Sequence, residues 1–190
     1  MHARFRGLGP VVVAGLLLLQ TAHATSVPEL TFEELTDTSN AIATGQVMRS
    51  WTAWDAEHKY IWTHYQLSVT SVKKGASADV VEFAEPGGVV DGVGMAIAGS
   101  VSYQPGENVL IFLQRMPNGY LRTTGWGQGK YVVDGAGRLH AAASLRGLEI
   151  VDGKSASAAP APSLGGMTGT EASRRIAARV RAAQSGERAQ

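Results

Sequence analysis

Hydrophobic residues occur in short runs along this chain, and the most apolar of these runs spans residues 109–113. Apolar side chains occupy both the odd and the even positions of that run, which predicts a strand buried on both faces. Asn118 and Gly119 follow, and this pair is typical of a tight hairpin because both residues tolerate positive φ. Residues 120–124 and 130–133 then predict further strands. We therefore expect the rest of the chain to pack around this hairpin.

The residues before this hairpin predict one short helix and several strands. Thr31 and Glu34 form a capping-box pattern, which predicts a helix over residues 32–38. Gly45 indicates a bulge or bend in the first strand, and the glycine-rich residues 86–99 predict a loop. The other strands are expected over residues 40–50, 60–72 and 79–84, with shorter ones at 101–103 and 138–142. The pattern predicts a mainly β fold: a small antiparallel OB-like barrel of five or six strands, with a short N-terminal helix and a C-terminal tail helix.

The first 24 residues have the pattern of a secretory signal peptide. Arg4 and Arg6 precede an apolar run over residues 11–19, and the small residues Ala22 and Ala24 fit a cleavage site after residue 24. A run of about nine apolar residues is too short to cross a hydrocarbon core, which needs about twenty. We therefore expect an exported protein, periplasmic or extracellular, with no transmembrane segment in the mature chain.

Composition divides the remaining chain into three segments. These are a barrel domain over residues 25–151, a disordered Ala/Pro/Ser/Gly linker over 152–169, and a basic helical or disordered tail over 170–190. In the tail, Ala172, Ile176 and Val180 recur every four residues and form a narrow apolar stripe among arginines. So narrow a stripe predicts a helix that docks only loosely on the rest of the chain. The alternative is a weak contact of the arginines with an anionic surface.

Cysteine content and charge narrow the classes of function. The chain contains no cysteine, so an exported form must fold without disulfides. Residues 25–151 carry a net charge of about −4, whereas residues 152–190 carry about +3. Binding to nucleic acid needs clustered lysine and arginine, which an acidic domain lacks. We therefore expect no nucleic-acid partner.

The sequence contains no motif that indicates catalysis, a metal or a cofactor. The mature chain has three histidines, His58, His64 and His140, and none stands in a metal-ligand spacing. Residues 125–130 lack the spacing of a phosphate-binding loop, and residues 92–97 lack the third glycine of a dinucleotide fingerprint. There is no Gly-x-Ser-x-Gly elbow and no cysteine nucleophile. We therefore expect no catalytic, cofactor-binding or metal-binding residues, and a protein that is not an enzyme.

A group of ring-bearing side chains within fourteen residues is the candidate contact surface. Its members are Trp51, Trp54, Tyr60, Trp62 and His64. Along the strand expected over residues 60–72, the even positions share one face and the odd positions share the more apolar face. The even positions should therefore lie at or near the surface, where aromatic residues of this density mark contact sites. The alternative is that Trp51 and Trp54 fold over the strand as a small hydrophobic cluster.

Four stretches, in this order, resemble the netrin-like module. They are NAIATGQV at residues 40–47, YIWTHYQLSVTSVKKG at 60–75, DVVEFAEPGG at 79–88 and GENVLIFLQ at 106–114. This OB-type barrel occurs in tissue inhibitors of metalloproteinases and in the C-terminal domains of complement proteins and netrins, and the resemblance implies a protein-contact module. Those domains carry disulfides, and the inhibitors present an N-terminal cysteine to zinc. This chain has no cysteine and its mature N-terminus would be Thr25, so no inhibitory residue carries over.

These observations lead to three hypotheses of function. The first is an exported non-catalytic binding module whose partner is another protein or a component of the cell envelope. The second is a carbohydrate- or cell-wall-binding module, because aromatic rings stack on sugar faces. The third is a hydrolase with an unrecognised site, for which Asp55 with Glu57, or Glu82 with Glu85, would supply paired carboxylates.

Overall fold

The structure, a computed structural model, describes residues 25–142, 148–151 and 163–187. Its elements in chain order are β1 (Thr25–Pro28), α1 (Phe32–Thr38), β2 (Ala41–Trp54), β3 (Ile61–Lys74), β4 (Val80–Pro86), β5 (Gly88–Val90), β6 (Val93–Met95), β7 (Asn108–Arg115), β8 (Leu121–Thr123), the 3-10 helix η1 (Trp126–Gly129), β9 (Lys130–Val133), β10 (Leu139–Ala141), β11 (Leu148–Val151) and α2 (Gly169–Glu187). The expected signal peptide and most of the expected linker lie outside the described residues. Among the helices of the described part, none has the length and apolar character that crossing a membrane requires.

Seven antiparallel strands form the main sheet, in the order β10-β9-β7-β2-β3-β4, with β8 also paired to β7. Two small sheets accompany it, the parallel pair β1–β11 and the antiparallel pair β5–β6. The prediction of a mainly β fold with a short N-terminal helix and a C-terminal helix is confirmed. The sheet has seven strands instead of five or six because the short strands β8 and β10 both pair in full with their neighbours.

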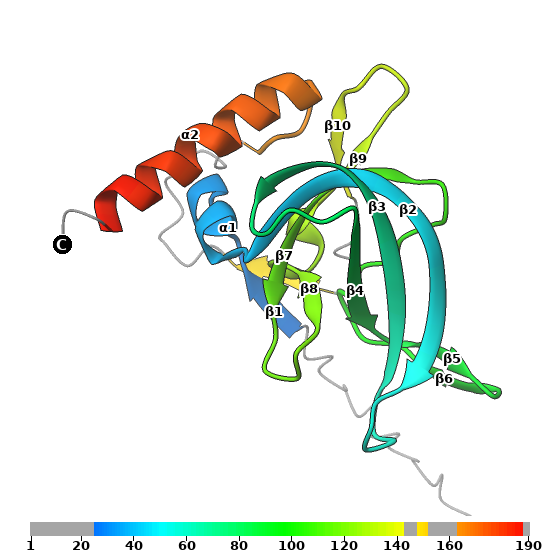
Figure 1. Ribbon diagram of the computed structural model, residues 1–190. Helices are drawn as coiled ribbons and strands as arrows, with labels where there is room; N and C mark the ends of the chain where they lie inside the picture. Colours follow the sequence, from blue (N-terminus) through cyan, green and yellow to red (C-terminus); the bar gives the residue numbers. More distant parts are fainter. Residues whose placement is uncertain (1–24, 143–147, 152–162, 188–190) are drawn as a thin grey trace, which may run out of the picture.

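The long curved hairpin of β2 and β3 organises the sheet (Figure 1). Its pairing is interrupted by three shifts of register, and one of them lies directly before Gly45. A side chain is excluded there, because a Cβ on Gly45 would lie 2.1 Å from the carbonyl oxygen of Ser68. Such irregularities bend a strand and increase its twist. The predicted bulge or bend at Gly45 is therefore confirmed.

Strand β7 is buried on both faces, as predicted, and it contributes to two hydrophobic cores. The inner core consists of Ala43, Val47, Tyr65, Leu67, Phe83, Val101, Tyr103, Val109, Ile111 and Leu113. The helix-covered core consists of Phe32, Leu35, Ile42, Leu110, Phe112, Tyr131, Leu139, Leu164, Ala172 and Ile176. Consecutive residues of β7 point to opposite sides, so Ile111 belongs to the inner core and Phe112 to the helix-covered core.

Helix α1 begins at the capping box that the sequence predicts. The backbone N–H of Glu34 donates to Thr31 Oγ1, and the backbone N–H of Thr31 donates to the Glu34 carboxylate at 2.9 Å. These two hydrogen bonds satisfy backbone donors that the first helical turn leaves unpaired. Phe32 and Leu35 then enter the helix-covered core.

Helix α2 is more deeply packed than its narrow apolar stripe predicts. Ala172 and Ile176 are buried at 1% and 0% exposure, and Arg179 forms an ion pair with Asp37 of α1. The stripe is sufficient because Leu164, in the last part of the expected linker, is also fully buried and widens the apolar contact. Figure 1 shows α2 lying across α1 at one end of the sheet. The expectation of loose docking is therefore corrected to docking through a buried core.

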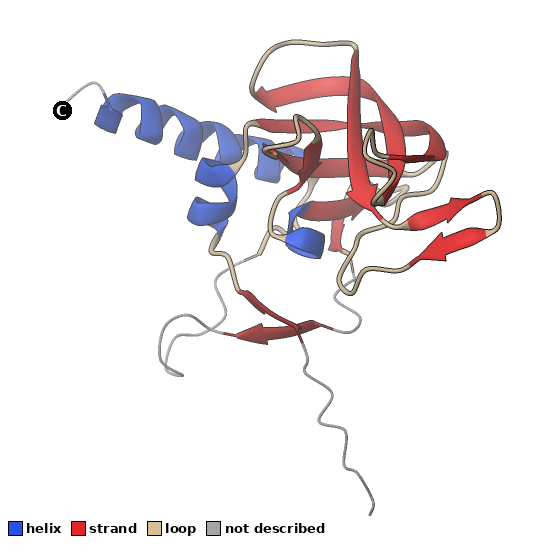
Figure 2. Cartoon of the chain, turned by 90° about the horizontal axis from the view of Figure 1, so that it is seen from below, coloured by secondary structure: helices blue, strands red, loops and turns tan. Residues whose placement is uncertain are grey.

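The glycine-rich residues 86–99, predicted as a loop, contain the β5–β6 hairpin. This hairpin projects from the sheet (Figure 2), and Figure 1 shows it near the end of the β2–β3 hairpin. Thr52 Oγ1 of β2 donates a hydrogen bond of 2.6 Å to the carbonyl oxygen of Val89, which fixes the hairpin there. The chain then returns through Val101 and Tyr103, which are buried in the inner core although they form no strand.

Candidate functional site

The five residues predicted as a contact surface lie at the end of the β2–β3 hairpin that is farther from the helices (Figure 1). Tyr60 is 42% exposed, and Trp51, Trp54 and Trp62 are half-buried. His64 is buried at 8% exposure, so it is not the exposed residue that its strand position predicts. Trp51, Trp62 and His64 share the outer face of the sheet, away from the inner core, whereas Trp54 and Tyr60 lie at the hairpin tip.

His64 is buried because other side chains cover it. It pairs with Trp51 across the two strands, and the two rings stack with centroids 5.2 Å apart and planes 11° apart. The Arg49 guanidinium lies over the Trp51 ring at 4.7 Å, and Tyr120 meets His64 edge-on at 5.2 Å. Burial lowers the pKa of His64 below its usual value, although the nearby Glu82 carboxylate acts in the opposite direction. His64 is therefore a neutral, packed ring near pH 7.

Trp62 connects this stack to a second group of side chains. Tyr120 contacts the Trp62 ring edge-on, with centroids 5.1 Å apart. The Arg122 guanidinium lies 5.9 Å from the Trp62 ring centroid and 4.6 Å from that of Trp126. These contacts join residues of β2, β3, β8 and η1. We name the whole set the aromatic–arginine cluster; it consists of Arg49, Trp51, Trp62, His64, Tyr120, Arg122 and Trp126.

Arg122 is held in place by a buried carboxylate. Glu85 is 1% exposed, and its Oε2 accepts hydrogen bonds from Arg122 Nε at 3.4 Å and Nη2 at 3.3 Å. Its Oε1 accepts a hydrogen bond of 2.7 Å from the backbone N–H of Thr123. Burial raises the pKa of Glu85 above the ordinary carboxyl value, while Arg122 and Thr123 lower it in part. The pair links β4 to β8 and fixes the guanidinium beside the indole rings.

The hairpin tip adds exposed apolar side chains beside the cluster. Trp54 stacks on His58 with ring centroids 6.1 Å apart, and Tyr60 follows at the start of β3. On the neighbouring β5–β6 hairpin, Val89 is 61% exposed and Val93 is 51% exposed. Together these residues form an apolar surface at one end of the molecule, next to the charged side chains of the two hairpin turns.

In the described part of the chain, the histidines contact carboxylates in separate pairs. Within the described residues, no three potential metal ligands gather closely enough to hold an ion. His64 Nδ1 lies 3.7 Å from a carboxylate oxygen of Glu82, which is too far for a hydrogen bond. His140 lies 2.7 Å from Asp134 on an exposed turn. Glu82 is exposed and Glu85 is buried, so these two carboxylates do not face a common substrate.

Sequence reasoning found the part of the cluster that lies on one hairpin and missed the rest. Tyr120, Arg122 and Trp126 are more than fifty residues away from Trp62 along the chain. The hairpin signal at Asn118 predicts that a strand follows, but not that this strand approaches β4. A useful signal was the density of cation and ring side chains between residues 120 and 126.

Comparisons with known proteins do not assign the chain to a family. It matches no protein-family model, no curated protein and no solved structure. Its function must therefore be inferred from the arrangement of its own side chains.

Proposed function

We propose that this chain is an exported, non-catalytic binding module that contacts another protein through the aromatic–arginine cluster and the hairpin tip. The observation that carries the proposal is the continuous row of ring and guanidinium contacts from Arg49 to Trp126, at the end of the hairpin that the helices do not cover. Aromatic and arginine side chains supply much of the binding energy at protein interfaces. Stacking already restricts these side chains, so they would lose little conformational entropy when a partner binds.

The surroundings of the cluster favour a polypeptide partner. Tyr60, Val89 and Val93 expose apolar surface beside it, and the charged side chains of Lys59 and Asp91 are exposed nearby in the sequence. An apolar centre with a charged margin is the usual composition of a protein interface. The cluster also presents the exposed Arg49, whose guanidinium suits a carboxylate on a partner.

A sugar ligand fits the same geometry less well. Stacking on a sugar requires an open ring face, and Trp51 is already stacked on His64 with Arg49 over its ring. Trp62 is likewise contacted by Tyr120 and Arg122. Tyr60 is the most exposed ring of the predicted surface, and a single ring gives a small platform. Carbohydrate binding therefore remains an outcome of the test below instead of the proposal.

We also propose that the main sheet is an OB-like barrel, as the netrin-like resemblance implies. The support is the bonding of Glu85 on β4 to Arg122 and Thr123 on β8. Strand β4 is the last strand of the sheet order, and β8 pairs with the central strand β7. Side-chain bonds between these two strands are expected where a sheet curls back on itself.

The binding proposal can be tested by capturing partners with variants of the immobilised chain. The bait is residues 25–190, presented to the exported proteins of the source cell, and captured proteins are identified by mass spectrometry. Arg49→Ser and Tyr60→Ser each remove one exposed side chain of the proposed surface. The matched control is Val80→Ala, because Val80 is 48% exposed and pairs with Ser68, at the opposite end of β4 from the residue paired with Trp62.

We expect a protein that wild type and Val80→Ala retain equally and that both surface variants lose. The proposal is contradicted when the two surface variants capture the same proteins as wild type. It is also contradicted when the bait retains cell-wall polysaccharide, Tyr60→Ser loses that polysaccharide, and no captured protein depends on Tyr60.

A further inference from the structure

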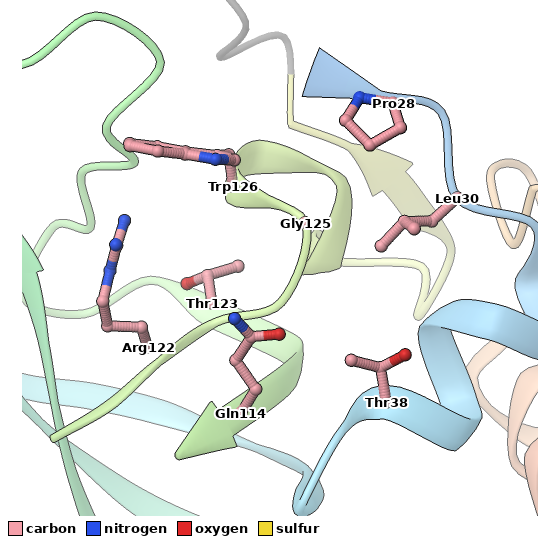
Figure 3. A pocket seen from close by; sticks show the side chains of 8 residues that line it. All are labelled: Pro28, Leu30, Thr38, Gln114, Arg122, Thr123, Gly125 and Trp126. Atoms are coloured by element: carbon pink, nitrogen blue, oxygen red, sulfur yellow. The ribbon is translucent and has the colours of Figure 1, made fainter. Parts of the chain in front are cut away.

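A small pocket lies directly behind the aromatic–arginine cluster (Figure 3). Its volume is about 230 Å³. The residues that line it come from four separate parts of the chain and are Pro28, Leu30, Thr38, Gln114, Arg122, Thr123, Gly125 and Trp126. Figure 3 shows Arg122 and Trp126 on one side, Pro28 and Leu30 on the other, and Gln114 with Thr38 at the base between them.

The two walls of the pocket are fixed to each other by Gln128. Its Oε1 accepts a hydrogen bond of 2.8 Å from the backbone N–H of Leu30, and its Nε2 donates one of 3.0 Å to the carbonyl oxygen of Pro28. The opposite surfaces also touch closely, since a Cβ on Gly125 would lie 2.7 Å from Leu30 Cδ1. The pocket is thus part of the folded structure and does not depend on a loop finding its position.

Trp126 adopts an unfavourable backbone conformation at the edge of this pocket. Its φ is +59° and follows Gly125 at +62°, so two consecutive residues are left-handed. Bulky residues are uncommon in this region, and such conformations cluster at functional sites. The conformation places the indole over the Arg122 guanidinium, which gives the pocket a flat apolar surface beside a cation.

Among the described residues that line the pocket, Arg122 is the only charged one. Glu85 accepts from its Nε and Nη2 atoms, which leaves further N–H groups of the guanidinium for a second acceptor. Gln114 also has bonding capacity, because its amide makes a single weak contact within the described residues, at 3.4 Å to the sulfur of Met116. Leu30 and Pro28 complete an apolar wall opposite these polar groups.

We infer that this pocket binds a small apolar carboxylate, with the carboxylate on Arg122 and Gln114 and the apolar part between Trp126 and Leu30. The volume decides the size, because pockets for drug-sized ligands occupy about 300–1,000 Å³ and this one is smaller. An arginine fork recognises a carboxylate better than a neutral group. The pocket shares Arg122 and Trp126 with the contact surface proposed above, but its test uses a small molecule and no protein partner, so the two proposals can fail separately.

The test is a titration followed by two-dimensional amide NMR of the full mature chain. The probe is 3-phenylpropionate, and its neutral analogue 3-phenylpropan-1-ol measures what the carboxylate contributes. We expect saturable shifts that centre on Gln114, residues 122–126 and the Trp126 indole. The alcohol should bind at least about tenfold more weakly, since hydrogen bonds to charged groups contribute about 1.5–3 kcal/mol.

Two variants place a fixed carboxylate in the pocket and should compete with the probe. Gln114→Glu should weaken binding of 3-phenylpropionate at least about tenfold, because the new carboxylate occupies Arg122. Thr38→Glu acts at an exposed position and serves where Gln114→Glu disturbs the fold. Gln46→Glu, at an exposed position of β2 outside the pocket, is the matched control and should leave binding unchanged. The inference is overturned by the absence of saturable shifts, by shifts that map elsewhere, or by equal binding of acid and alcohol.

Discussion

The outer face of the main sheet is covered in two different ways at its two ends. At one end, Ile42 and Phe112 are fully buried beneath α1 and α2. At the other end, Trp51 and Trp62 stay half-buried and are covered by rings and guanidinium groups instead of by a helix. Strand β2 therefore contributes both to a closed apolar core and to a surface that remains accessible.

The difference in burial indicates a separate role for each end of the sheet. Ile176 of α2 is 0% exposed, so the apolar side of the helix stabilises the fold. Trp51 and Trp62 of the aromatic–arginine cluster are only half-buried, and several contacts of the cluster are weak pairs of ring with ring or ring with cation. A face arranged this way contributes modestly to stability and keeps residues that a partner can use.

The largest effect is expected in the inner core. Ile111→Asp places a carboxylate without a partner at a position that is 0% exposed on the doubly buried strand β7. Burying an unpaired charge is costly enough to prevent folding in a domain of ordinary stability. Amide NMR should show loss of native dispersion, and a native-like spectrum would mean that the core lies elsewhere.

The helix-covered end is expected to depend on apolar burial more than on charge. Ile176→Ala should lower the free energy of unfolding by about 2–5 kcal/mol, the usual cost of such a truncation in a core. Arg179→Gln removes the ion pair with Asp37 at an exposed position and should change the melting temperature little. Urea unfolding of both variants compares apolar burial with the ion pair. A larger loss of stability in Arg179→Gln than in Ile176→Ala would mean that α2 docks loosely through charge.

The end of the sheet that carries the aromatic–arginine cluster should lose less stability than the helix-covered end when a large ring is removed. Trp62→Ala removes contacts with Tyr120 and Arg122 and should cost about 1–2 kcal/mol. Phe112→Ala, in the helix-covered core, should cost about 3–5 kcal/mol. Equal losses in urea unfolding would place Trp62 in a core and remove the distinction between the two ends.

The smallest effect concerns pH. Because burial raises the pKa of Glu85, the folded chain holds that proton more tightly than the unfolded chain does. Between the ordinary carboxyl value of 4.5 and the raised value, this group therefore makes stability fall as pH rises. The difference in unfolding free energy between wild type and Glu85→Gln should be most favourable to wild type below this window. A difference that stays constant from acidic to neutral pH would contradict the account.

The sequence predicts those features whose causes are local. Thr31 and Glu34 are three residues apart and predict the start of α1, and the doubly apolar run predicts β7. The depth of α2 is not predictable from its own stripe, because it depends on Leu164 and on the sheet face opposite. Placement of Arg122 depends on the approach of β8 to β4, which no short-range pattern expresses.

The most direct test of the contact surface uses the tryptophans themselves. All four tryptophans of the chain, Trp51, Trp54, Trp62 and Trp126, lie in the aromatic–arginine cluster or at the hairpin tip, and both cores lack tryptophan. Tryptophan fluorescence, excited at the long-wavelength edge where tyrosine does not absorb, therefore reports on this region. Titration of the captured partner into residues 25–190 should shift or quench the emission saturably, with an affinity that Arg49→Ser weakens. Saturable binding, measured by calorimetry, that leaves the emission unchanged would contradict the account.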